Sequence, residues 1–230
     1  MKPWRVRQWC IPPESNAEFV WKMEDVLDVY TRPFKAGHVL VCMDEASKQQ
    51  IKEVRPPVPQ APGRDYRYDA EYQRNGVSNL FMFFAPLDSW RHVEVTDQRT
   101  AVDWAREVRH LVDDHFPKAE KIVLVMDNLN THSPSSLYDA FSPQEAKRIL
   151  DKLEIHYTPK HGSWLNMAEI ELSVVARQCL SRRIPDQQTL RQEVTAWEKA
   201  RNADGATVDW RFNTDTARVK LKRLYPSVVV

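Results

Sequence analysis

The amino-acid sequence predicts an α/β protein in which a mixed β-sheet is covered by helices. Two observations lead to this fold class. Short runs of β-favouring apolar residues recur along the chain, and the elements follow in the order strand, strand, strand, helix, strand, helix, strand, helix. Strands that come first as a group and then alternate with helices are typical of a mixed sheet with helices packed on it.

The first elements are a helix and a buried strand. Ser15, with Glu18 three residues later, is typical of a capping box, and apolar residues recur at helical spacing over residues 15–30. The apolar run from Val39 to Met43 favours a buried strand. The segment Val54–Gly63 is rich in proline, which indicates an exposed loop.

The middle of the chain predicts two further strands and a helix. Residues 79–87 and 91–97 are rich in β-favouring residues, and a turn near Asp88 should join them. Apolar residues between positions 102 and 112 have helical spacing, so we expect a helix that stops before Pro117.

The remaining elements alternate between strands and helices. Ser142 is followed by Pro143 and Glu145, a pattern typical of a helix N-terminus. The expected elements are a buried strand over residues 121–128, a helix after Ser142, a short strand over 154–159, a helix from Leu165 to Arg183, and a last helical region after Pro185.

Composition places the chain among ordinary globular proteins. Its 230 residues are 42% hydrophobic and 28% charged, which is enough for one large core, and the net charge of +1 does not by itself indicate a nucleic-acid partner. The three cysteines, Cys10, Cys42 and Cys179, are widely spaced, as in a reducing cytosol. No signal peptide or membrane-spanning stretch is evident, so we expect an intracellular protein that does not bind membranes.

Two acids follow two of the apolar strands. Asp44 comes after the run from Val39 to Met43, and Asp127 comes after the strand that begins at residue 121. If these strands are neighbours, their carboxylates emerge side by side, where they repel each other unless a cation lies between them. Each acid alone has an ordinary alternative role as a solvated strand end or a helix cap.

A third acid belongs to the helix expected from Leu165. Glu169 lies on a mostly apolar stripe of this helix, so its carboxylate should point toward the core or a cleft. Glu171 also has apolar neighbours, and periodicity does not decide between the two. Three carboxylates would supply the hard oxygen ligands that Mg²⁺ or Mn²⁺ prefers, as in two-metal cleavage of a phosphodiester.

Three motifs resemble those of a known family. "CMDE", "VLVMDNLNTH" and "HYTPKHGSWLNMAEIE" look like the DDE transposases of bacterial insertion sequences, in the group called insertion sequence six-thirty, which is allied to the mariner elements. The resemblance covers almost the whole chain. It implies a ribonuclease-H-like five-stranded mixed sheet flanked by helices, with a helical C-terminal extension. It also implies metal-dependent DNA strand cleavage and strand transfer at the ends of the element.

The resemblance assigns roles to individual residues. It makes Asp44, Asp127 and Glu169 the catalytic, metal-binding acids, with Glu169 in preference to Glu171. The remaining motif residues would position the acids or the substrate; they are Glu45, Asn128, His132 and Asn166. A lone histidine after a strand is often only a structural hydrogen-bonding group, and both roles stay open for His132.

The resemblance further implies cofactors, partners and a location. The cofactors are two Mg²⁺ or Mn²⁺ ions, and the partners are DNA, both transposon ends and target, with a homodimer or a synaptic assembly. The location is the bacterial cytoplasm, near the nucleoid. Weak DNA contacts are expected from a set of basic residues and one tryptophan, which are Lys160, Trp164, Arg182, Arg183, Arg218, Lys220, Lys222 and Arg223. The basic residues could equally be solvated helix faces, and for Trp164 a place over the core is favoured over base stacking.

Two features depart from the family pattern. The spacing from Asp127 to Glu169 is longer than in the mariner branch. The opening "MKPWRVRQW" is similar to the linker before the catalytic domain, so we expect a fragment or truncated product without the family's helix-turn-helix modules.

The expected organisation is a linker and helix over 1–38, a catalytic domain over 39–183 and a helical extension over 184–230. The alternatives are a ribonuclease-H-like nuclease without strand transfer and an inactive DNA-binding remnant.

Overall fold

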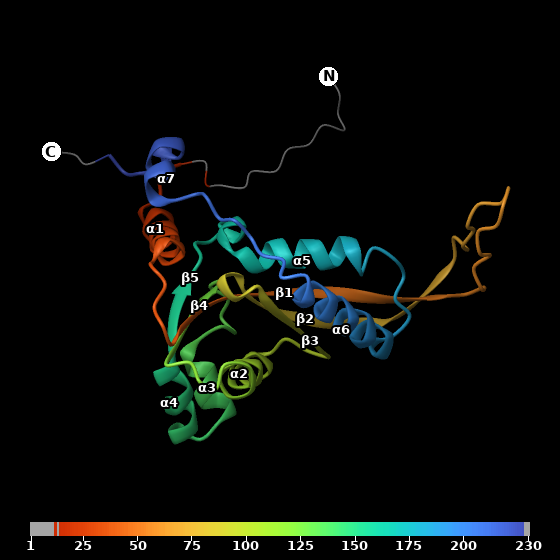
Figure 1. Ribbon diagram of the computed structural model, residues 1–230, viewed down its shortest axis with the longest axis horizontal. Helices are drawn as coiled ribbons and strands as arrows, with labels where there is room; N and C mark the ends of the chain where they lie inside the picture. The colour runs from red at the N-terminus through yellow and green to blue at the C-terminus, as the bar shows by residue number, and fades with distance from the viewer. Residues whose placement is uncertain (1–11, 13, 228–230) are drawn as a thin grey trace.

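A five-stranded mixed sheet forms the centre of the computed structural model, which describes residues 12 and 14–227 (Figure 1). The strands are β1 (His38–Glu53), β2 (Tyr72–Ala85), β3 (Trp90–Thr96), β4 (Lys121–Met126) and β5 (Leu153–Tyr157), in the spatial order β3-β2-β1-β4-β5. The three strands that come first in the sequence pair antiparallel, and β4 and β5 continue the sheet in parallel from β1. The predicted mixed sheet is therefore confirmed.

Helices cover both faces of this sheet. They are α1 (Ala17–Thr31), α2 (Ala101–His110), α3 (Pro134–Ala140), α4 (Pro143–Lys152), α5 (Met167–Gln178), α6 (Gln187–Ala203) and α7 (Thr214–Lys220). Helices α2, α3 and α4 pack on one face, and α5 and α6 lie along the other, with α1 and α7 beside them (Figure 1). A short π-helical turn, Leu111–His115, extends α2 before Pro117.

The alternation of side chains along β1 divides the core into two layers. Cys42 points to the layer that contains α1, α5 and α6, whereas Val41 and Met43 point to the layer that contains α2, α3 and α4. Each strand in the centre of the sheet is apolar on both faces, which explains the continuous apolar runs in the sequence. The buried side chains of the C-terminal helices, such as Leu190 and Ala217, belong to the first layer.

Strand β1 is much longer than the sequence pattern indicates. The expected strand ended at Met43, but pairing with β2 continues past Asp44 and Glu45 as far as Glu53. The far ends of the two strands and the segment that joins them leave the body of the protein as an arm, which projects well beyond the helices (Figure 1). The tip of the arm has two isolated bridges and is exposed, as the proline-rich segment predicted.

Three other local expectations need correction. The N-cap of α1 is Asn16 rather than Ser15, since the Asn16 side chain accepts a hydrogen bond from the Phe19 amide at 2.9 Å. The helix expected from Leu165 to Arg183 is shorter, because a 3₁₀ turn precedes it and α5 ends at Gln178. The short helix α3 was not predicted, since its seven residues are too few to show a period.

Three further expectations concern the cysteines, the N-terminal linker and membrane-spanning helices. Cys42 and Cys179 are buried and free, while Cys10 lies outside the described residues. The same is true of most of the expected N-terminal linker, residues 1–11 and 13. Within residues 12 and 14–227, none of the helices is both long and apolar enough to cross a bilayer.

Candidate active site

The parallel pairing of β1 with β4 brings two acids together. Cys42 pairs with Val125, so the register carried two residues further places Asp44 beside Asp127. Asp127 directly follows the last residue of β4, as expected, but Asp44 lies in the middle of β1 because β1 continues along β2. The carboxylates are therefore neighbours at the edge where β4 ends.

The electrostatics of Asp44 link it to both of the other candidate acids. Burial is the main cause that raises the pKa of Asp44 to about 7, and repulsion from Asp127 and Glu169 raises it further. A hydrogen bond from the Glu45 backbone amide, at 2.8 Å, partly offsets these effects. A carboxyl group with this pKa lacks a positive neighbour sufficient to keep it ionised.

Glu169 enters the site from the first turn of α5. Asn166 is the N-cap of this helix and accepts a hydrogen bond from the Ala168 amide at 3.1 Å. Its Nδ2 donates to the backbone oxygen of Met43 at 2.7 Å, which fixes the start of α5 to β1 one residue before Asp44. Glu169 is exposed, so of the two expected directions, the core and a cleft, the core is excluded; its charge still acts on Asp44.

Glu171 has a different environment from Glu169. It is completely buried, and its two oxygens accept hydrogen bonds from Arg201 on α6 at 2.7 and 2.8 Å. The guanidinium of Arg91, also completely buried, lies 3.2 Å away. Glu171 therefore joins α5 to β3 and α6 and is not available to a substrate.

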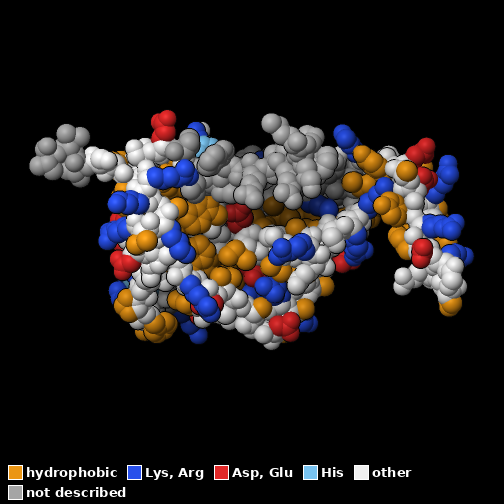
Figure 2. Space-filling model, turned by 90° about the horizontal axis from the view of Figure 1, so that it is seen from above, with side chains coloured by type: hydrophobic (Ala, Val, Ile, Leu, Met, Phe, Trp, Pro, Cys, Tyr) orange, Lys and Arg blue, Asp and Glu red, His pale blue; other side chains and the backbone are white. Residues whose placement is uncertain are grey.

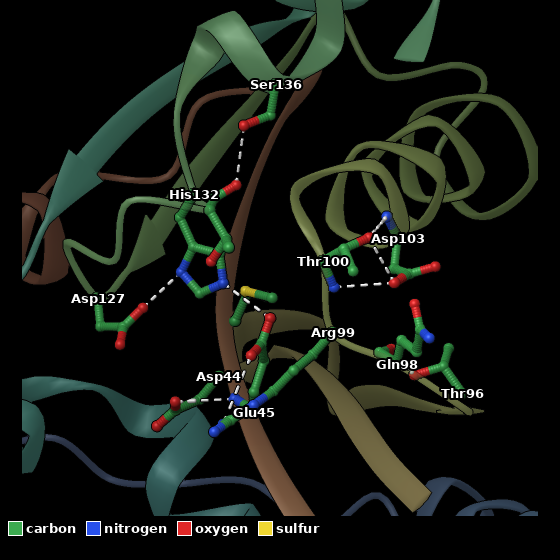
Figure 3. Close-up of polar contacts among 12 residues, drawn as sticks. Asp44, Glu45, Thr96, Gln98, Arg99, Thr100, Asp103, Asp127, His132 and Ser136 are labelled. Atoms are coloured by element: carbon green, nitrogen blue, oxygen red, sulfur yellow. Dashed lines mark hydrogen bonds and ion pairs between the residues drawn. The ribbon is translucent and has the colours of Figure 1, made fainter. Parts of the chain in front are cut away.

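His132 connects Asp127 to Glu45 (Figure 3). Its Nδ1 lies 2.5 Å from Asp127 Oδ1, and its Nε2 lies 2.8 Å from Glu45 Oε1. Burial lowers the pKa of His132, but the hydrogen bonds to Asp127 and Glu45 outweigh this and raise it to about 9. The ring is thus an imidazolium at neutral pH, and the indole of Trp104 stacks on it with 5.9 Å between centroids.

Asp44 and Glu45 point to opposite faces of β1, as Figure 3 shows. Asp44 faces the α5 side, and Glu45 faces the α2 side, where it meets His132. The second oxygen of Glu45 is buried without a hydrogen-bond partner among the described residues, and Arg99 lies 3.9 Å from it. No sequence pattern indicated Arg99, because it lies in an irregular segment between β3 and α2.

A cavity adjoins Asp127. Its volume is about 510 Å³, and its lining includes the exposed residues Asn128 and Lys160. The cavity runs from the end of β4 to the first turns of α1, which contributes Lys22. Asn128 and Lys160 thus lie near the acids, as the motifs indicated.

The other predicted DNA contacts do not gather at the acids. Arg182 is paired with Glu193 and Arg218 with Glu24, while Arg183 binds Glu53 at the base of the arm. Lys220, Lys222 and Arg223 are exposed at and after the end of α7. On the face shown in Figure 2, Lys and Arg side chains lie in several places among acidic ones and form no single basic patch in its described part.

Trp164 packs against the core, which is the favoured one of its two expected roles. It is half-buried beside the layer that contains α1 and α5, and its ring meets Phe212 edge-on with 5.7 Å between centroids. Its indole nitrogen is buried and has no hydrogen-bond partner among the described residues.

The three acids suit a divalent cation chemically. Carboxylate oxygens are the ligands that Mg²⁺ and Mn²⁺ prefer, and Asp44 lies near enough to Asp127 and Glu169 for their charges to repel. As the side chains stand, no three His, Cys, Asp or Glu residues in the described part of the chain converge as a ready-made ligand set. The residues fit the ions, and their side chains would have to close around them.

Comparison with known proteins gives a family match and a structural likeness. The family model described as DDE superfamily endonuclease matches residues 39–191. Among solved structures, the Mos1 mariner paired end complex with Mn has a TM-score of 0.58 and 16% identity, covering 87% of this chain and 62% of that chain. The Mos1 strand transfer complex has a TM-score of 0.58 and 16% identity, covering 87% of this chain and 61% of that chain. No curated protein matches this sequence.

The isolated catalytic domain of the Mos1 mariner transposase is also similar. Its TM-score is 0.55 with 14% identity, covering 86% of this chain and 90% of that domain. The likeness shows the ribonuclease-H-like fold that the motifs implied. The chain spans about 62% of the length of the first of these transposase chains.

Proposed function

The chain belongs to the DDE superfamily of endonucleases, and from this premise we propose that it is a transposase catalytic domain that cuts and joins DNA strands. The observation that supports this best is that Asp44 on β1 lies near enough to Asp127, directly after β4, and to Glu169, on α5, for both to repel its charge. Burial is the main cause of the raised pKa of Asp44, and repulsion from the other two acids raises it further. Cations bound between the three carboxylates would offset this repulsion and keep all three ionised.

We assign Asp44, Asp127 and Glu169 as ligands of two Mg²⁺ or Mn²⁺ ions. Bound ions of this kind activate the attacking water or 3′-hydroxyl and stabilise the leaving oxygen of a phosphodiester. The chain's own contribution is to hold three oxygen ligands on three separate elements. The solved neighbours include Mos1 complexes described with Mn and with Mg.

The surrounding residues would keep the acids in place. His132 fixes the carboxylate of Asp127 through its Nδ1, and Glu45 on its other nitrogen keeps the ring charged and correctly oriented. Asn166 fixes the start of α5, and therefore the reach of Glu169, against β1. Asn128 lies in the cavity beside Asp127, where a substrate could contact it.

The proposed partner is DNA, both the ends of a transposon and the target. The related Mos1 structures are described as paired end and strand transfer complexes, which supports an assembly of two chains on two DNA ends. We further propose that the element is a bacterial insertion sequence of the six-thirty group and that the protein acts in the cytoplasm, at the nucleoid. Because Arg182, Arg183 and Arg218 are already ion-paired, we expect residues 1–230 to bind DNA weakly, through phosphates.

A strand transfer assay tests this function. The substrate is a labelled duplex with a pre-cut element end, the target is a supercoiled plasmid, and the reaction contains Mg²⁺ or Mn²⁺. Joined products that vanish in Asp127→Asn would support the transposase. Nicking without joining would favour a nuclease of the same fold, and the absence of any metal-dependent product would favour an inactive DNA-binding remnant.

A further inference from the structure

The segment between β5 and α5 is a tight turn with a fixed position. Gly162 donates a backbone hydrogen bond to the oxygen of Pro159 at 2.8 Å, which closes a four-residue turn. A Cβ at Gly162 would lie only 2.6 Å from Pro159 Cγ, so this close approach requires glycine. We call residues 159–162 the rim turn.

The rim turn is tied to the active site on both sides. Before it, the backbone amide of Thr158 donates to the oxygen of Met126 at 2.9 Å, next to Asp127. After it, a 3₁₀ turn leads to Asn166, whose side chain holds the start of α5 to β1. The turn therefore cannot shift without disturbing the strand end that presents Asp127 or the helix that presents Glu169.

The rim turn also holds a strained residue. His161 has a φ of 64°, in the left-handed region that disfavours residues with a Cβ. Such a backbone conformation is strained for a residue other than glycine, and strained positions are often found at functional sites. The histidine side chain is exposed, so no burial of its ring offsets this strain.

The rim turn carries two side chains that can bind an anion. Both line the cavity beside Asp127. Lys160 and His161 are exposed at its wall, and Asn128 and Ser163 add polar groups. Lys22, on the α1 side of the same cavity, binds Glu18 at 2.8 Å. The cavity of about 510 Å³ is thus lined by two acids, Asp127 and the Lys22-paired Glu18, and by the side chains of Lys160 and His161.

We propose that the rim turn is a phosphate-binding element, and that the cavity receives the sugar–phosphate backbone of the DNA strand leading to the phosphodiester that is cut. Lys160 and His161 contact phosphates of this strand, while the acids act on the neighbouring bond. The rigid turn presents both side chains without the entropic cost of ordering a loop on binding. This inference rests on the proposed function, since it names the strand that the same site handles.

The test compares DNA binding and DNA cleavage in matched variants. Lys160→Gln removes the charge, and His161→Asn keeps a residue that tolerates the left-handed backbone. The control is Lys118→Gln, which changes an exposed lysine just before the start of β4, whereas Asp127 follows the end of that strand. Binding of a fluorescent duplex is measured by anisotropy between about 50 and 200 mM salt, in EDTA, so that the readout does not depend on catalysis.

We expect Lys160→Gln and His161→Asn each to weaken binding about fivefold at the lower salt concentration, while the control stays at the wild-type value. The dependence of log affinity on log salt should become shallower by about one for Lys160→Gln, because one phosphate contact is lost. Lys160→Arg should restore both the affinity at low salt and the salt dependence of the wild type. A merely structural role of the turn would lower affinity without changing the salt slope.

The binding and cleavage results separate this inference from the proposed function. If the wild type cleaves DNA and both rim-turn variants bind it as the wild type does, the phosphate-binding role is overturned and the endonuclease stands. If the wild type shows no cleavage with either metal but Lys160→Gln still loses affinity and salt slope, the catalytic assignment falls and the phosphate-binding role stands.

Discussion

The side-chain amide of Asn166 donates a hydrogen bond to the backbone oxygen of Met43, with 2.7 Å between the two atoms. This bond joins the first turn of α5 to the middle of β1, and both residues are buried. Asp44 follows Met43 directly, and Glu169 lies in the first turn of α5. This buried contact, between elements that are far apart in the sequence, therefore helps to set the separation of the two acids.

Replacing Asn166 by Asp should reduce cleavage more than it reduces folding. The carboxylate can still cap α5, but it cannot donate to the Met43 oxygen, so α5 should move away from β1. We expect a loss of about 1–3 kcal/mol in the free energy of unfolding, measured with urea, and a fall of more than about tenfold in cleavage rate. Wild-type cleavage with the same loss of stability would show that Asn166 does not position Glu169.

Glu169→Gln and Glu171→Gln should fail in different ways. Glu169 is exposed, so its substitution should leave the urea midpoint near that of the wild type while cleavage falls by about a hundredfold or more. Glu171 is buried between Arg91 and Arg201, and losing its charge should destabilise the fold by about 3–5 kcal/mol.

The control for both substitutions is Asp139→Asn, which changes an exposed acid on α3. It should alter neither stability nor cleavage. A normal cleavage rate in Glu169→Gln, combined with a stable but inactive Glu171→Gln, would reverse the assignment of the third acid.

Asp44→Asn should stabilise the metal-free protein in a pH-dependent manner. The pKa of Asp44 is about 7 in the folded state, above its value near 4 in an unfolded chain. Between these values the folded state binds more protons, so the free energy of unfolding of the wild type falls as pH rises through this window, by an upper limit of roughly 4 kcal/mol.

Asp44→Asn cannot ionise at this position, so its free energy of unfolding should not fall in this way as pH rises. Thermal melts in EDTA should therefore show a higher melting temperature for Asp44→Asn than for the wild type at about pH 8, and nearly equal values at about pH 4. A constant difference across this range would mean that burial and repulsion do not act on Asp44 as the structure indicates.

Divalent cations should stabilise the wild type selectively. Ions that bind the folded state alone raise the free energy of unfolding by RT ln(1 + [L]/Kd), which is about 2.7 kcal/mol at a hundredfold excess over Kd. Mn²⁺ or Mg²⁺ should thus raise the melting temperature of the wild type and scarcely change that of Asp127→Asn. Equal shifts in the two proteins would place the ions elsewhere.

The sequence by itself determined the elements of the sheet and the two aspartates that meet on it. The apolar runs in β1, β2 and β4 are visible locally, because a strand segment buried on both faces needs apolar residues throughout, whereas β3 shows the alternation of a strand buried on one face. The cap at Ser142 was likewise correct, since capping depends on neighbours in the sequence. The motif resemblance, rather than periodicity, preferred Glu169 over Glu171.

Only the tertiary structure decided how the charged groups around the site are paired. The length of β1 depends on β2, which pairs with it beyond Met43, and the burial of Glu171 depends on Arg91 and Arg201 from β3 and α6. His132 binds Glu45, which precedes it by 87 positions. No local pattern encodes such contacts, because the pKa and burial of an ionisable group are set by whichever distant residues the fold brings against it.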